Sequence, residues 1–243
     1  MHGGNPLPRL SAGARCEGCA IRHSSVCGAL SGDEIAALNA LARRKRLAAG
    51  ETYLMAGDTA GDFGNITRGV AKLVRGAEDG RLQIVGLLFQ SDFVGSGLEG
   101  DAPEKASSIE AVTDLELCLF PRKPFQDVLA RYPSLEHRLL KRALDELRFA
   151  REWMVLLGRK TAEERVATFM LHMARRLQSE GCHHRESFDI PLNRAEIADY
   201  IGLTLETVSR QMTKLRKDGI VVFEGAHHVQ SIDHARLVER AGF

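Results

Sequence analysis

Residues 187–225, SFDIPLNRAEIADYIGLTLETVSRQMTKLRKDGIVVFEG, carry the most specific structural signal in this chain. Two short helices are predicted, over residues 193–201 and 205–218, and a tight turn containing Gly202 joins them. An apolar run and a glycine follow over residues 220–225, and this pattern is typical of a β hairpin. The segment therefore predicts a winged helix-turn-helix.

The second helix of this segment has two different faces. Val208, Met212 and Leu215 share the side that is expected to be buried. The exposed side carries the residues predicted to contact DNA, which are Glu206, Thr207, Ser209, Arg210, Lys214 and Lys217. Arginine can bind guanine through two hydrogen bonds, glutamate can accept one from cytosine, and lysine suits phosphate groups. A solvated amphipathic helix in a structural helical hairpin is the alternative interpretation.

A long helix is predicted over residues 133–158, because Pro133 opens a stretch with no further proline and no glycine before Gly158. One apolar stripe lies close to a heptad seam and comprises Leu140, Leu144, Leu147, Met154 and Leu157. A neighbouring stripe comprises Leu139, Ala143, Ala150 and Trp153. We expect the first stripe to form a homodimer interface and the second to face a sensor domain. A helix packed entirely on its own domain is the alternative.

Short β-prone runs separated by glycines fill residues 47–120, including ITRGVAKLV, LQIVGLLF and LELCLF. This spacing predicts an antiparallel β-roll or jelly roll. A short helix is expected before it, over residues 31–42. The predicted fold class is therefore α+β. The expected parts are a β-roll sensor domain (31–132), a dimerisation helix (133–158) and a winged helix-turn-helix domain (159–243).

The composition is that of an ordinary globular chain. Its 243 residues are 44% apolar and 27% charged, which is enough for two modest cores. The formal net charge is +1, so DNA binding must depend on a local basic surface. The sequence has no dinucleotide-binding glycine pattern and no cluster typical of a catalytic nucleophile, and we expect no enzymatic activity.

Three cysteines, Cys16, Cys19 and Cys27, lie in the polar stretch RCEGCAIRHSSVCGAL near the start of the chain. The first residues, MHGGNPLPRL, lack the apolar centre of a signal peptide, and no segment has the roughly 18 apolar residues of a membrane span. We therefore expect a cytoplasmic protein. Its five cysteines would be kept reduced there, which favours metal or redox chemistry over disulfides.

Several segments resemble the Crp/Fnr superfamily of transcription regulators. GLTLETVSRQMTKLRKDG resembles its recognition helix, and the pattern Glu206-x-x-Ser209-Arg210 looks like that of the FNR branch. REWMVLLGRKTAEERVATFM is similar to the dimer helix and the helix that follows it, and DGRLQIVGLLFQSDFVGS to the β-roll. The alphaproteobacterial FnrL group of oxygen-responsive regulators is the nearest resemblance.

The resemblance implies that residues 1–30 form a loop that holds a [4Fe–4S] cluster. Its ligands would be Cys16, Cys19, Cys27 and Cys118, and four thiolates are the usual ligands of such a cluster. Structural zinc also takes four thiolates, but it more often uses two Cys-x2–4-Cys pairs, whereas this chain has one. Cys182, which precedes two histidines, is left over.

The implied function is oxygen-responsive transcription regulation. In low oxygen the cluster would favour a homodimer that binds a palindrome with TTGAT-like half-sites and contacts RNA polymerase, activating or repressing genes for anaerobic or microaerobic life. The stretch GSGLEGDAPEKASSIEA lacks the phosphate-binding pairs of cyclic-nucleotide-binding relatives, so cyclic AMP is not expected. Some oxygen-responsive relatives have an acidic residue where this chain has Ala150. The alternatives are a regulator with zinc or no metal, and an iron–sulfur electron-transfer protein.

Overall fold

The computed structural model describes residues 16, 18–56, 58, 61–76, 80–95, 107–177 and 187–242. A 3-10 helix and an α-helix, η1 (Val26–Ala29) and α2 (Gly32–Leu41), precede an antiparallel β-roll. The strands of the roll are β1 (Arg43–Leu47), β2 (Thr52–Leu54), β3 (Phe63–Arg68), β4 (Ala71–Gly76), β5 (Leu82–Leu88), β6 (Phe93–Val94), β7 (Ser108–Ala111) and β8 (Leu115–Phe120). They form two sheets, in the orders β1-β8-β3-β6 and β2-β7-β4-β5.

The two sheets of the roll pack face to face through alternating apolar side chains. Ile66, Leu115 and Leu117 are at most 1% exposed between them. The predicted run ITRGVAKLV proves to be two strands, because the chain turns at Gly69 between β3 and β4. Gly69 has a φ of +92°, and a Cβ there would lie 2.3 Å from the Asp114 carbonyl oxygen, so this tight turn requires glycine.

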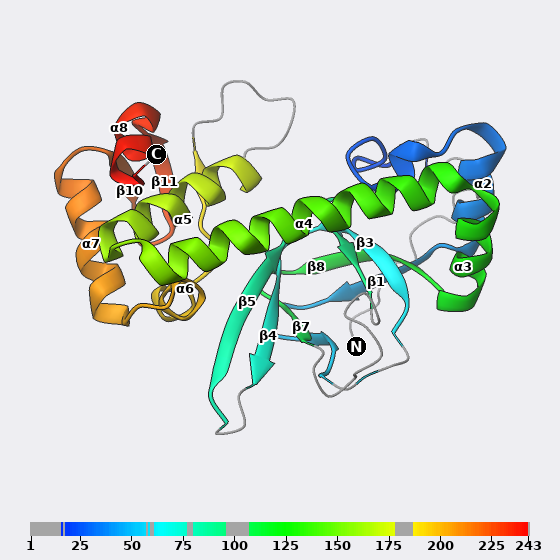
Figure 1. The fold of residues 1–243 in the computed structure, drawn as a ribbon, viewed down its shortest axis with the longest axis horizontal. Helices are drawn as coiled ribbons and strands as arrows, with labels where there is room; N and C mark the ends of the chain where they lie inside the picture. Colours follow the sequence, from blue (N-terminus) through cyan, green and yellow to red (C-terminus); the bar gives the residue numbers. More distant parts are fainter. Residues whose placement is uncertain are drawn as a thin grey trace, which may run out of the picture.

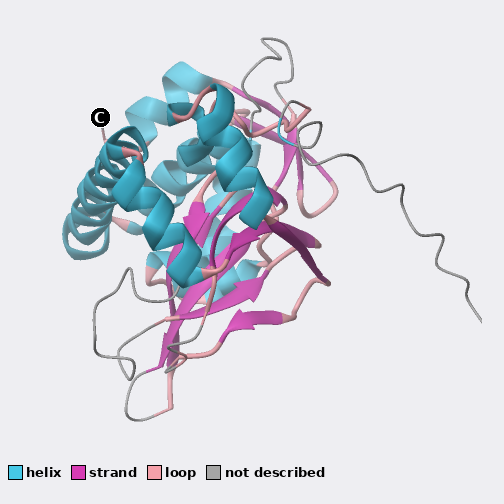
Figure 2. Ribbon diagram, turned by 90° about the vertical axis from the view of Figure 1, so that its right-hand side faces the viewer, coloured by secondary structure: helices cyan, strands magenta, loops and turns pink. Residues whose placement is uncertain are grey.

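Three helices follow the roll: α3 (Arg122–Arg131), α4 (Pro133–Arg159) and α5 (Ala162–Leu177). Figure 1 shows that α4 runs along the length of the molecule, with the β-roll below it and the C-terminal domain at one end. Figure 2 shows the helices gathered on one side of the sheets. The sequence reading assigned no helix to α3, which packs Phe125 and Val128 under the end of the roll.

The C-terminal domain is a winged helix-turn-helix. It contains β9 (Phe188–Asp189), α6 (Arg194–Ile201), α7 (Leu205–Lys217), β10 (Val221–Glu224), β11 (His228–Ile232) and α8 (His234–Arg240). The wing is a sheet of three strands in the order β10-β11-β9, one strand more than the predicted hairpin. Both predicted helices are present. Asn193 caps α6, since its side chain accepts hydrogen bonds from the amides of Ala195 and Glu196.

The two stripes of α4 have different surroundings in the chain. The predicted seam is exposed: Leu140, Leu144, Leu147, Met154 and Leu157 are 38–71% exposed. The predicted inward stripe is partly wrong, because Ala143 and Ala150 are also exposed. The face that packs on the rest of the chain comprises Leu135, Leu139, Arg142, Phe149, Trp153 and Leu156. Alanine contributes little apolar area, so the larger side chains decide which face is buried.

An apolar core joins α4 and α5 to both the roll and the C-terminal domain. Trp153 stacks on Tyr200 of α6 with ring centroids 4.5 Å apart. The roll also contacts α6 directly, because Lys72 pairs with Glu196 at 2.9 Å and the Ile84 amide donates to Asp199 at 3.0 Å. The C-terminal domain is therefore docked on the sensor domain of its own chain. In the part of the chain that the structure describes, no helix combines the length and apolarity that a membrane span needs.

Candidate cysteine site and nucleic-acid interface

The structure brings Cys16, Cys19, Cys27 and Cys118 to one cavity. Cys27 lies in η1, which begins after Ser25; the Ser25 hydroxyl accepts a hydrogen bond from the Cys27 amide at 3.3 Å. Cys118 lies in the middle of β8, and its side chain points toward the N-terminal segment. These four cysteines form no disulfide. Segments that are remote in sequence therefore supply thiols to the same place.

Apolar side chains form most of the remaining wall of this cavity, which is lined by Ile21, Arg22, Ile35, Leu38, Asn65 and Phe120. Burial raises the pKa of the Cys27 thiol to about 11 and that of Cys118 to about 12, and the neighbouring cysteines add to both shifts. The two thiols are consequently neutral near pH 7. A metal bound here must displace their protons.

Four cysteine thiols fit a [4Fe–4S] cluster, which usually takes four thiolates, and the same donor set also suits zinc. A tetrahedral zinc site with Zn–S bonds of about 2.3 Å holds its sulfurs roughly 3.8 Å apart. Among the described residues, no group of three or more His, Cys, Asp or Glu could hold one metal ion. In the structure the four thiols line one cavity and are not gathered as ligands of a single ion. The cavity that they line has a volume of about 20 Å³, enough for about one water molecule.

Asn65 of β3 is a residue of this site that the sequence reading missed. It is 0% exposed and lies directly across from Cys118 in the β3–β8 pairing. Its Nδ2 donates to the Cys27 sulfur at 3.6 Å, while its Oδ1 has no hydrogen-bond partner among the described residues. A buried amide is costly unless it is paired. An asparagine between apolar strand residues is the one signal that could have identified it.

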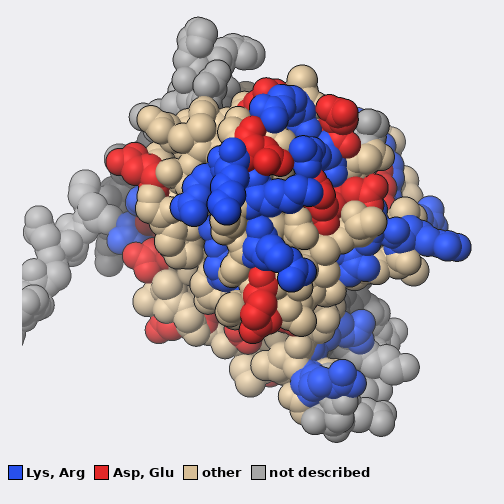
Figure 3. Space-filling model, turned by 90° about the vertical axis from the view of Figure 1, so that its left-hand side faces the viewer, with Lys and Arg blue, Asp and Glu red and all other residues tan. Residues whose placement is uncertain are grey.

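The predicted DNA-contacting residues share one face of α7. Thr204 caps the helix by accepting a hydrogen bond from the Thr207 amide, and Gly202 makes the preceding turn with a φ of +64°. Val208, Met212 and Leu215 are buried, as predicted. Glu206, Arg210, Lys214 and Lys217 are exposed, and Thr207 and Ser209 are half-buried. Figure 3 shows lysine and arginine side chains gathered at this end of the molecule.

A groove of about 520 Å³ follows the middle and end of α7 and is lined by Ser209, Arg210, Thr213, Lys214, Lys217 and Asp218. Lys214 is not independent there, because its ammonium group lies 2.6 Å from the Glu163 carboxylate of α5. Glu163 also pairs with Arg240, and hydrogen bonds from both cations lower the pKa of the Glu163 carboxyl. Glu163 therefore neutralises part of the charge that Lys214 could offer to a phosphate.

Some predicted features lie outside the described residues. These are Cys182 with His183 and His184, and most of the stretch in which phosphate-binding pairs were sought. The structure therefore leaves the exclusion of cyclic AMP and the role of Cys182 as predictions.

Comparisons with known proteins match both halves of the chain. Residues 44–132 match the cyclic nucleotide-binding domain family, and residues 164–240 match the Crp-like helix-turn-helix domain family. The transcriptional activator protein FnrL of Cereibacter sphaeroides is 45% identical, over 94% of this chain and 92% of its own length. The nitrogen fixation regulation protein FixK of Bradyrhizobium diazoefficiens is 40% identical, over 91% and 92%. The solved structure of FixK2 from Bradyrhizobium japonicum has a TM-score of 0.73 at 32% identity and covers 82% of this chain and 96% of its own.

Proposed function

The chain belongs to the FNR branch of the Crp/Fnr family, whose members are dimeric DNA-binding transcription regulators and not enzymes, and from this premise we propose that it is an oxygen-responsive regulator. The signal is the presence or loss of a [4Fe–4S] cluster on Cys16, Cys19, Cys27 and Cys118. When bound, the cluster supplies an oxygen-labile cross-link between the N-terminal segment and β8.

The observation that carries this proposal is the convergence of four thiols from two remote segments on one cavity. The apolar wall around them would limit access of water and other ligands. Asn65 would donate to a ligand sulfur, and Ser25 fixes the backbone of Cys27. These residues would hold the thiolates, while the chemistry with oxygen belongs to the cluster.

The DNA-binding step uses the exposed face of α7. Arg210, one turn into the helix, would read guanine, and the lysines further along would bind phosphates. The exposed apolar seam of α4 would pair with the same seam of a second copy, since large exposed apolar stripes mark interaction surfaces. A two-fold dimer would present two recognition helices to a palindrome of TTGAT-like half-sites and regulate transcription through RNA polymerase.

Metal analysis tests the proposal directly. Protein purified without oxygen should be brown and contain about four irons and four sulfides per chain, and both should disappear in air. Serine at Cys16, Cys19, Cys27 or Cys118 should each remove most of the colour. The matched control is Cys182→Ser, which should keep it.

Three outcomes would identify another function. Stoichiometric zinc without sulfide would make the cysteine site structural. A colourless protein that binds DNA equally with and without oxygen would be a metal-free regulator. A stable cluster in a protein that binds no DNA would indicate electron transfer.

A further inference from the structure

Arg142 interrupts the buried stripe of α4. Leu135 and Phe149, one heptad on either side of it, both pack on the body of the chain. An apolar residue at position 142 would continue this stripe, yet a guanidinium group occupies it with its side chain 27% exposed. A partly buried cation is retained where it has partners. The partners of Arg142 therefore indicate what the residue does.

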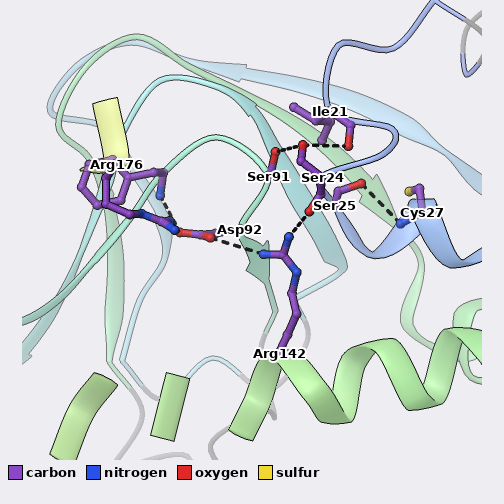
Figure 4. Close-up of polar contacts among 9 residues, drawn as sticks. Ile21, Ser24, Ser25, Cys27, Ser91, Asp92, Arg142 and Arg176 are labelled. Carbon is purple, nitrogen blue, oxygen red and sulfur yellow. Dashed lines mark hydrogen bonds and ion pairs between the residues drawn. The ribbon is translucent and has the colours of Figure 1, made fainter. Parts of the chain in front are cut away.

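Arg142 binds two parts of the molecule at once (Figure 4). It donates to the carbonyl oxygen of Ser24, which lies between Cys19 and Cys27, and it pairs with the Asp92 carboxylate at 3.5 Å. The hydroxyl groups of Ser24 and Ser91 are 2.6 Å apart, within hydrogen-bond distance. The cysteine segment is thus attached to α4, and to the turn before β6, by groups that are not cysteines.

Asp92 extends this set of contacts to the DNA-binding half of the chain. Its carboxylate accepts a hydrogen bond from the Phe89 amide at 2.9 Å and pairs with Arg176 near the end of α5. The Arg176 guanidinium also lies over the Phe89 ring, 4.8 Å from its centroid. The Asp92 side chain is 17% exposed, so solvent screens these ion pairs less than pairs on the open surface.

The turn that carries Asp92 is held rigidly. Ser91 has a φ of +76°, and no other non-glycine residue in the described ranges has a positive φ. Its amide donates to the Ile66 carbonyl, and the Ile66 amide donates to the Asp92 carbonyl, so the turn is fixed to β3. Such backbone strain persists where the surroundings enforce it, and it is concentrated at functional positions.

We propose that Asp92 is a positioning residue that couples the cysteine segment to the DNA-binding domain, through Arg142 on one side and Arg176 on the other. The inference rests on the proposed function in one respect, which is that cluster loss is the event that releases the segment. Release of Ser24 removes one partner of Arg142, which then draws the Asp92 carboxylate away from Arg176. The end of α5 loses its link to the sensor domain as a result.

Coupling of this kind is reciprocal, so DNA must alter the cysteine segment as well. We would measure amide hydrogen exchange at residues 21–28 in metal-free protein, in which the segment exchanges between its attached and released forms, with and without a saturating concentration of a duplex carrying the TTGAT inverted repeat. Wild type should show a change of about fivefold or more on DNA binding. Asp92→Asn, which keeps the shape but removes the charge, should abolish that change. The matched control is Asp145→Asn, since Asp145 pairs with Arg148 on the same helix, and this variant should behave as wild type.

The inference is overturned if wild type shows no such change, or if Asp92→Asn and Asp145→Asn respond alike. Arg142→Met provides a second variant, in case Asp92→Asn does not fold, and it should also abolish the change. In anaerobic protein that retains its colour, both network variants should reduce the ratio of DNA affinities with and without cluster by about fivefold or more. Because the exchange comparison uses metal-free protein, it decides this inference even if metal analysis overturns the proposed cluster.

Discussion

The cysteine site and the recognition helix are built in different ways. The cysteines come from an irregular N-terminal segment and from β8, and Cys27 and Cys118 are substantially desolvated. The residues predicted to contact DNA all come from the 13-residue helix α7, which has its own N-cap and its own buried face. The first site depends on contacts between segments that are far apart in the sequence, whereas every residue predicted for the second lies on a single helix.

The two sites should therefore respond differently to the mutation of a single residue. An exposed helix face should lose affinity in steps, because each side chain contacts DNA separately. A buried site shared by two segments should respond as a unit, because losing one group leaves the others buried without a partner. Single substitutions at each site, and in the regions between them, test that contrast.

Leu147→Asp should have the largest effect, because it changes α4, the helix that contacts both η1 and the DNA-binding domain. Two aspartates facing each other in a dimer seam should weaken association by about 3 kcal/mol or more, roughly 100-fold. Sedimentation of anaerobic protein measures this effect. Leu82→Asp is the matched control, since Leu82 is 65% exposed on β5, away from the seam. If both variants stay dimeric, the seam of α4 is not the dimer interface.

Arg210→Ala should cost roughly 1–3 kcal/mol at each half-site and relax the preference for one base pair, as expected for a bidentate guanine contact. Titration against the palindrome, its single-base variants and random DNA measures both effects. The cluster colour should not change, because no residue of α7 lines the cysteine cavity. Equal losses on specific and random DNA would instead make Arg210 a phosphate contact.

The core between the two sites contains a buried histidine, His172, which should make the stability of the protein depend on pH. It is 9% exposed against Phe89, Phe149 and Trp153, and burial, with Arg176 and Arg175 nearby, lowers its pKa to about 3. The unfolded chain binds this proton below about pH 6.5 and the folded chain does not, so stability falls as pH decreases from 6.5 toward 3. At pH 5 the free energy of unfolding is therefore about 2 kcal/mol lower than at neutral pH.

His172→Phe should remove that part of the pH dependence. Urea unfolding of both proteins at pH 5 and pH 7.5 measures it, and the difference between the two proteins isolates the histidine from the carboxyl groups. An identical pH dependence in both would mean that His172 is protonated inside the fold.

Asn65→Leu should weaken the binding of the metal group at the cysteine site by about 1 kcal/mol or less. It should not lower the free energy of unfolding of metal-free protein. Leucine has the same branching but larger methyl groups, and the cost of fitting them is offset because the change removes a buried Oδ1 that lacks a partner among the described residues. Losing the N–H donor to the Cys27 sulfur should lower the reduction potential of the loaded site and speed its bleaching in air. Thr67→Val, on the same strand, is the control. A large loss of metal-free stability would make Asn65 a structural residue.

The two lysines of α7 should give the smallest and most graded effects. Lys217→Ala should weaken binding to specific and random DNA alike and reduce the salt slope by about 0.9 unit for one phosphate contact. Lys214→Ala should reduce the slope less, because Glu163 already pairs with Lys214. Equal reductions would show that DNA displaces Glu163 completely.

The sequence predicted α7 and its buried side well, because the helical period, the Thr204 cap and the Gly202 turn are all local. Heptad spacing likewise predicted the apolar seam of α4, which is exposed in the structure. The inward face of that helix was not, since Ala143 and Ala150 continue the spacing but offer little area to bury. Pattern alone does not show which of two stripes meets a neighbour.

The residues that the sequence reading missed act through tertiary contacts. Asn65, Asp92 and Arg142 look like isolated polar residues in their own segments, and their roles arise from partners far away in the chain. The fold of the roll was predictable as a class from its glycine-separated runs. Its register, which places Cys118 opposite Asn65, depends on long-range strand pairing that no local pattern specifies.

The length of α4 has a mechanical consequence. At 27 residues the helix is about 40 Å long, with no proline after its first position, so it behaves as a stiff rod. The N-terminal half touches η1, while Trp153 and Leu156 near the other end touch the DNA-binding domain (Figure 1). A tilt of about 3° at the first end displaces the second by roughly 2 Å. In the proposed dimer the two recognition helices would have to match half-sites about 34 Å apart on DNA, and a tilt of α4 would change the distance between them directly.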